Sequence, residues 1–174
     1  MSKKFRNILI VVVAALVIGS CIFMFRISPI KVKTGNREMP EANGSTDEIT
    51  QGIVIDQSFE NITEDIKEIA VVFNRLYYLD ENCDVNIELL DGEQVLVSKT
   101  YDADSIEGSH RTYLYPNEPL SGLVGKQLTL RIYSPTTWGT GLSVMVQNDA
   151  SNSTYTFGNK TKKGTICFSI TGKE

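Results

Sequence analysis

Apolar and polar residues alternate with a period of two in several segments of the second half of the chain. This pattern restricts the possible fold class more than any other feature of the sequence. Leu128, Leu130 and Ile132 alternate with Thr129, Arg131 and Tyr133, and similar runs occupy residues 85–90, 142–147 and 166–171. Successive side chains of an extended strand point to opposite faces, so this period puts one face on a core and the other toward solvent. No segment after residue 25 sustains the 3.6-residue period of a helix. The pattern therefore predicts half-buried β-strands.

Further strands are expected at residues 52–59, 69–73, 95–101, 111–115 and 154–157, separated by turns rich in Pro, Gly and Asn. Asp91-Gly92 lies between two of these segments and indicates a hairpin, because both residues tolerate a positive φ. Eight or nine short strands at this spacing predict an all-β fold, an antiparallel jelly-roll-like β-sandwich, over residues 49–174.

An uninterrupted apolar segment precedes this domain. Ile8 to Phe25 contains no charge and no proline among its 18 residues. As a helix it would rise ~27 Å, close to the ~30 Å hydrocarbon core of a bilayer. The sequence therefore predicts a single transmembrane helix at residues 8–25. It follows a basic head at 1–7 and precedes a flexible stalk at 26–48, where Pro and Gly recur among scattered charges.

The orientation of the predicted anchor depends on its flanks. Three Lys and Arg residues precede it and four follow, so flanking charge alone does not determine the orientation of the helix in the membrane. We expect the N-terminus in the cytoplasm, because a short basic head before an apolar run is how secretory signals begin. Cleavage at Gly19-Ser20 and lipidation of Cys21 are alternatives. The apolar run continues to Phe25 past both positions, which favours an uncleaved signal anchor in the cell membrane.

Charge and composition exclude some classes of function. Four of the 17 Lys and Arg residues lie in the first 26 positions, so from Ile27 onward 13 basic residues face 21 acidic ones, a net charge of −8. A domain with this negative charge is unsuited to binding the phosphate backbone of nucleic acids, which is itself negatively charged. Three cysteines and one histidine are too few for a zinc framework.

Several segments carry a family resemblance: Gln57-Ser58-Phe59, Ile69–Phe73 continuing to Tyr77-Tyr78, Val85–Asp91 and Gly125–Ser134. In order and rhythm they resemble the jelly-roll β-sandwich modules of bacterial surface and membrane-associated proteins, which are related in form to galactose-binding and carbohydrate-binding domains. The resemblance covers residues 50–147 and, more loosely, extends to 171. It implies the fold and a bacterial envelope setting. It transfers no ligand-binding motif residue by residue.

Aromatic residues are the candidates for ligand binding. Trp138 lies in a loop of Ser, Thr, Pro and Gly, where an exposed ring can stack on a sugar face. The alternative is that Trp138 folds back over the end of the sandwich as part of the core. We expect the other members of such a site to be Tyr113, Tyr115, Tyr155, Arg111 and Arg75.

Catalytic and metal-binding patterns are sparse. His110 has no accompanying nucleophile motif, and we expect an exposed polar side chain there, not a triad member. Asp102 and Asp104 alternate in a loop and are the best candidates for a structural Ca²⁺, although no EF-hand-like loop surrounds them. No other cofactor is expected. Cys83 and Cys167 could form a disulfide in an oxidising compartment, and two free thiols are an equal alternative.

The sequence thus favours a non-catalytic, single-pass membrane protein whose external domain binds a glycan or another envelope component. The alternative is an accessory or structural ectodomain that contacts a partner protein in a membrane complex through a sandwich face or an edge strand. An enzyme ranks third, because no catalytic constellation is present.

Overall fold

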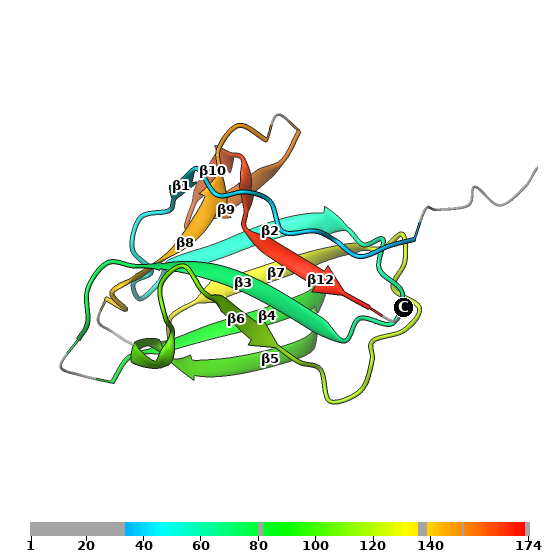
Figure 1. Cartoon of the computed structure of the whole chain (residues 1–174), viewed down its shortest axis with the longest axis horizontal. Helices are drawn as coiled ribbons and strands as arrows, with labels where there is room; N and C mark the ends of the chain where they lie inside the picture. The colour runs from blue at the N-terminus through cyan, green and yellow to red at the C-terminus, as the bar shows by residue number, and fades with distance from the viewer. Residues whose placement is uncertain (1–33, 80–81, 136–138, 151, 173–174) are drawn as a thin grey trace, which may run out of the picture. The chain divides into compact units, whose positions relative to one another are not determined.

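The computed structural model describes residues 34–79, 82–135, 139–150 and 152–172. They form an all-β structure of two six-stranded antiparallel sheets, consistent with the predicted β-sandwich (Figure 1). The first sheet contains β1 (Gly44–Ser45), β3 (Glu68–Arg75), β6 (Arg111–Leu114), β8 (Leu142–Gln147), β11 (Thr165–Ile166) and β12 (Phe168–Thr171). The second contains β2 (Val54–Glu60), β4 (Asp84–Asp91), β5 (Gln94–Asp102), β7 (Gln127–Tyr133), β9 (Thr154–Phe157) and β10 (Lys160–Lys163).

The chain passes repeatedly between the two sheets. In the second sheet the order is β10-β9-β2-β7-β4-β5, so β5 and β10 are its edges. In the first sheet β8 and β12 both pair with β3, β6 lies on the other side of β3, and β1 and β11 pair with β8. A short 3₁₀ turn, η1 (Ala103–Ser105), follows β5. Strands that pair are therefore often far apart in sequence.

The predicted alternation matches the burial of β4 and β7, whereas consecutive residues are buried in β12 and in the first half of β8. In β7, Leu128, Leu130 and Ile132 are fully buried while their neighbours are at least partly exposed. The core combines such residues from both sheets, and its largest fully buried side chains are Phe73 and Phe168. Removal of this apolar surface from water is the main stabilising term, at about 25 cal/mol per Å² buried.

The predicted hairpin forms, with its turn one residue later than expected. Asp91 pairs with Gln94 as the last rung of β4 and β5, so the two loop residues are Gly92 and Glu93. Gly92 has a φ of 61°, whereas Glu93 is not among the residues with positive φ. Glycine with a positive φ at the first loop position, followed by a residue without one, is the pattern of a type II′ turn.

The expected single strand at 166–171 is divided at Cys167. Ile166 pairs with Val146 of β8, whereas Phe168 pairs with Val71 of β3. The Cys167 N–H donates to Met145 of β8, and its carbonyl accepts from Val72 of β3. The chain therefore changes partner strand at this residue.

Part of the segment expected as a stalk contributes to the first sheet. The backbone of Arg37 exchanges two hydrogen bonds with Ile170 of β12, and Gly44 and Ser45 form β1 against β8. Ahead of β2, Ile49 is fully buried. The predicted anchor at 8–25 and Cys21 lie outside the described residues, among which no helix is long and apolar enough to span a membrane.

Candidate functional site

An aromatic groove runs between β5 and β6, which are edge strands of different sheets. It has a volume of about 360 Å³ and is lined by Lys99, Tyr101, Ser105, Ile106, Glu107, His110, Arg111, Thr112, Tyr113 and Tyr115. A second hollow of about 520 Å³ follows β5 and shares Tyr115 with the first. We call the two together the tyrosine groove. It contains three of the residues that the sequence proposed for ligand binding: Arg111, Tyr113 and Tyr115.

Strand periodicity brings these three side chains together. Arg111, Tyr113 and Tyr115 are each two residues apart, so an extended backbone directs them to one face. Leu114, between the two tyrosines, is buried in the core and fixes that orientation. The rings of Tyr113 and Tyr115 are stacked, with centroids 5.8 Å apart and planes 10° apart. Tyr115 is 55% exposed, so the pair offers an accessible aromatic surface.

Tyr101 joins the two sides of the groove. Its hydroxyl, on β5, donates a hydrogen bond to the Tyr113 carbonyl on β6. Burial raises the pKa of Tyr101 to about 12, so the phenol stays protonated and remains a donor at physiological pH. The Lys99 ammonium lies 4.6 Å from the Tyr101 ring centroid. Such cation–π contact places a positive charge at the wall of the groove.

Arg75 supports the groove from behind and does not line it. Its side chain is only 9% exposed. The guanidinium donates to the carbonyls of Ala103 and Ile106 and lies 3.5 Å from the Asp104 carboxylate. These contacts hold the η1 loop, which supplies Ser105, Ile106 and Glu107 to the groove wall. Arg75, which the sequence offered as a ligand donor, thus holds the η1 loop from behind the groove.

Another predicted ligand-binding residue, Tyr155, does not line this groove. Tyr155 is 3% exposed and lies on β9, at a different pocket. Trp138 lies outside the described residues. His110, by contrast, is exposed at the groove rim, as expected, and its ring approaches Glu107 at 3.6 Å.

The carboxylates considered for Ca²⁺ serve the η1 turn. Asp102 accepts a hydrogen bond from the Asp104 N–H at 3.0 Å, which caps the turn, and Asp104 faces Arg75. Among the described residues, no group of three or more His, Cys, Asp or Glu side chains could hold a metal ion. Asp102 and Asp104 are thus engaged with the protein itself.

The disulfide considered between Cys83 and Cys167 is not formed. Both are free thiols, and both are buried. Cys83 precedes β4 of the second sheet and packs in the hydrophobic core, whereas Cys167 lies between β11 and β12 of the first sheet, outside that core cluster. Burial raises the pKa of Cys167 to about 11, so this thiol is protonated and unreactive at neutral pH.

Sequence reasoning missed Lys99 and Tyr101. Their spacing of two indicated a shared strand face, yet nothing local indicated that this face meets the edge of the other sheet. Comparison with known proteins adds no further assignment: no protein-family model matches this sequence, and no curated protein matches it.

Proposed function

We propose that this chain is a membrane-anchored, extracytoplasmic binding protein whose β-sandwich recognises a glycan or another cell-envelope component without catalysing a reaction. The apolar run at 8–25 and its short basic head support an anchor with a cytoplasmic N-terminus. The repeated passage of the chain between two antiparallel sheets supports a jelly-roll-like topology. The domain would then face the envelope.

The stacked and exposed Tyr113–Tyr115 pair carries the proposal. An aromatic face presents the right surface to the CH groups of a pyranose ring, because both are flat and apolar. The exposed side chains of Arg111 and Lys99 lie in the same groove and can donate hydrogen bonds to sugar hydroxyls or ring oxygens. A few polar groups around an apolar platform are typical of small-ligand sites.

The test is a glycan array probed with the full chain in a non-ionic detergent, followed by titration of any glycan that binds. Tyr115→Ala should weaken binding roughly tenfold, because removal of one stacking ring costs about 1.4 kcal/mol. Tyr78→Ala is the matched control, since Tyr78 is exposed beside Arg75 and outside the groove. It should leave glycan binding unchanged.

Unchanged glycan binding by Tyr115→Ala would refute the site.

A second function, docking of a partner protein, is favoured by one observation: β5 and β6 are both edge strands, and Val95 on β5 is an exposed hydrophobic residue. Edge strands can pair with a strand of another chain. Stoichiometric cross-linking to one envelope protein, together with no affinity for any glycan, would favour this alternative.

A further inference from the structure

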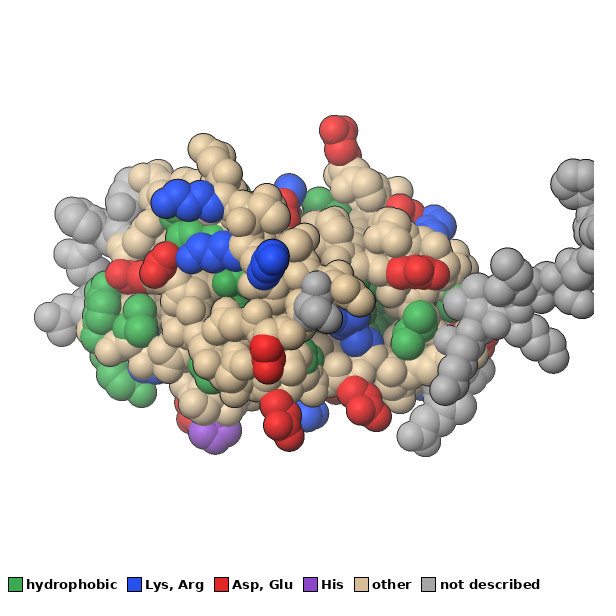
Figure 2. All heavy atoms as spheres, turned by 90° about the horizontal axis from the view of Figure 1, so that it is seen from above, with side chains coloured by type: hydrophobic (Ala, Val, Ile, Leu, Met, Phe, Trp, Pro, Cys, Tyr) green, Lys and Arg blue, Asp and Glu red, His purple; other side chains and the backbone are tan. Residues whose placement is uncertain are grey.

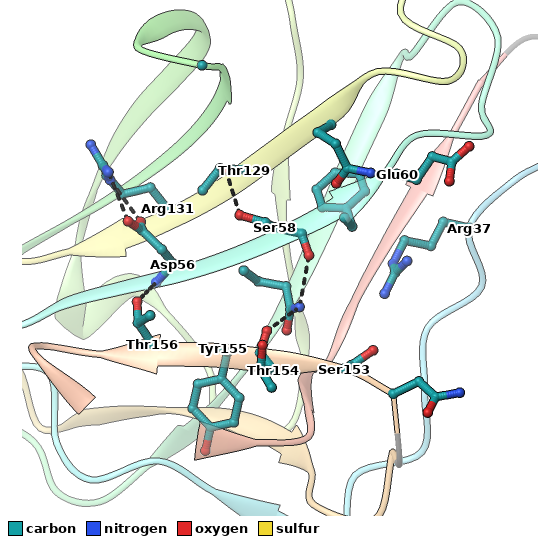
Figure 3. Close-up of a pocket in the computed structure, with 15 residues that line it drawn as sticks. Arg37, Asp56, Ser58, Glu60, Thr129, Arg131, Ser153, Thr154, Tyr155 and Thr156 are labelled. Carbon is teal, nitrogen blue, oxygen red and sulfur yellow. Dashed lines mark hydrogen bonds and ion pairs between the residues drawn. The ribbon is translucent and has the colours of Figure 1, made fainter. Parts of the chain in front are cut away.

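A second groove opens where β9 separates from β2. The two strands pair only at Ile55 and Asp56 of β2, and beyond that point they diverge. The opening has a volume of about 650 Å³. Figure 3 shows β2 with Ser58 on one side, Ser153 and Thr154 on the other, and the guanidinium of Arg37 pointing into the space between them. We call this opening the Arg37 groove.

Arg37 is held firmly in place. Its backbone N–H donates to Ile170 and its carbonyl accepts from the same residue, at 2.9 and 3.0 Å. Its guanidinium carbon lies 4.2 Å from the ring centroid of Phe168 and 5.3 Å from that of Phe59. The cation thus packs against two rings whose planes are tilted by 57° to each other, and its guanidinium points into the groove (Figure 3).

The cation has no counterion among the described residues. Its Nε is buried without a hydrogen-bond partner, and no described carboxylate forms an ion pair with it. Burial lowers the pKa of Arg37 from its usual value, but a guanidinium still remains charged in a protein. A half-buried charge and an unsatisfied donor are both costly to leave unpaired. An anionic ligand in the groove would pair with the charge.

The acids of the groove are otherwise engaged or directed elsewhere. Asp56 accepts two hydrogen bonds from Arg131, at 2.8 and 2.9 Å. Figure 3 shows the carboxylate of exposed Glu60 directed away from the guanidinium of Arg37. The lysines of β10, Lys160, Lys162 and Lys163, lie on the strand next to β9, and Lys162 pairs with Asp47 at 3.3 Å. Figure 2 shows basic and acidic side chains on the same face of the molecule.

We propose that the Arg37 groove binds the carboxylate of an acidic sugar, such as a hexuronate residue of a polysaccharide. The planar guanidinium matches a planar carboxylate, and its single charge balances one negative charge. A phosphate dianion would leave excess negative charge beside Glu60. The hydroxyls of Ser58, Ser153 and Thr154 are suited to sugar hydroxyls around the carboxylate. This is a site separate from the tyrosine groove and does not depend on it.

The first test follows the Arg37 Nε–Hε signal by NMR in the full chain, assigned by its loss in Arg37→Lys. Titration with glucuronate should shift this signal at lower concentration than acetate, phosphate or neutral glucose does. An unmoved Nε–Hε signal, or equal effects of glucuronate and acetate, would overturn the acidic-sugar assignment. Tighter binding of phosphate would overturn it as well.

The second test uses variants. Arg37→Gln should weaken glucuronate binding ten- to a hundredfold, the usual effect of losing a charge-assisted hydrogen bond. Lys67→Gln, which removes one positive charge at an exposed position outside both grooves, is the control and should have no effect. Glu60→Gln should tighten binding two- to threefold by removing a nearby negative charge. If Glu60→Gln lowers Tm as much as Arg37→Gln does, Glu60 is the natural partner of Arg37 and the proposal fails.

Discussion

At the scale of the residue, Tyr101 contributes both to the stability of the fold and to the structure of the tyrosine groove. It lies at the edge of the second sheet, partly buried, and its hydroxyl is bonded to the backbone of the first sheet at Tyr113. Burial raises its pKa from 10.0 to about 12 because the phenolate loses hydration there. The folded protein therefore holds this proton more tightly than the unfolded chain does.

We predict that Tyr101 makes stability fall at high pH. Its contribution is fully present below about pH 10, and it is lost as pH rises from about 10 to about 12, because only the unfolded chain releases the proton in that window. The loss should reach about 2 kcal/mol. Urea unfolding between pH 8 and 11.5 measures it.

Tyr101→Phe supplies the control for this prediction. Other tyrosines, Tyr77 and Tyr155 among them, also have raised pKa values, so the difference between the two proteins isolates Tyr101. The variant should be about 1 kcal/mol less stable at neutral pH, because it lacks the hydrogen bond to Tyr113. Parallel stability curves from pH 8 to 11.5 would contradict the assignment.

At the scale of the element, β2 buries one polar side chain within an otherwise apolar face. Its core-facing positions are Ile55, Gln57 and Phe59, so a polar residue occupies the middle one. The Gln57 amide donates to the Thr154 carbonyl of β9 at 2.9 Å and accepts from the Ile166 N–H of β11 at 3.2 Å. It therefore links the second sheet to the first close to the Arg37 groove.

We predict that Gln57→Leu lowers the free energy of unfolding by about 2 kcal/mol. Leucine matches the apolar surroundings but leaves the buried Ile166 N–H without a partner, and the desolvation of that donor is not recovered. Ser58→Ala is the matched control on the opposite face of the strand, where a change within about 0.5 kcal/mol is expected. Chemical denaturation measures both. Equal stability of Gln57→Leu and the parent protein would show that the amide link is dispensable.

At the scale of the whole molecule, the envelope setting of both binding proposals depends on the proposed membrane topology. The exposed lysines of β10, Lys160 and Lys163, report on the domain, while Lys3 and Lys4 report on the N-terminal head. A reagent that modifies amines but cannot cross a bilayer distinguishes the two compartments.

We predict that such a reagent labels Lys160 and Lys163 in intact spheroplasts and reaches Lys3 and Lys4 only after lysis. The physical reason is the short basic head, which favours retention on the cytoplasmic side. Peptide mass spectrometry measures the modification of each site, with a cytoplasmic protein as a control for leakage. The reverse labelling pattern would place the sandwich in the cytoplasm and remove the basis for glycan binding at the envelope.

The strands themselves were predictable because their signal is local. The alternation in residues 128–133 reflects burial of one face of the strand and exposure of the other, and the strand carries this information alone. The short β1 and β10 were missed: two residues are too few for a period, and the Lys-Thr-Lys-Lys sequence of β10 has no apolar face. Lysine-rich strands such as β10 are typical of the edges of sheets, where they prevent pairing with other chains. Which strand lies at an edge is decided only by the tertiary structure.

By itself, the sequence determined the all-β class, most strand positions, the hairpin after β4 and the shared face of Arg111, Tyr113 and Tyr115. Tertiary structure alone decided which strands became neighbours. It placed the Tyr101 hydroxyl against the Tyr113 carbonyl and left Cys83 and Cys167 as free thiols. It also placed Arg75 against the η1 loop, and Arg37 against Phe168 at the opening between β2 and β9. The physical reason is that the same period-two pattern recurs in most of the strands, so it specifies a buried face without specifying a partner. The partner is settled only when the strands pack around one core.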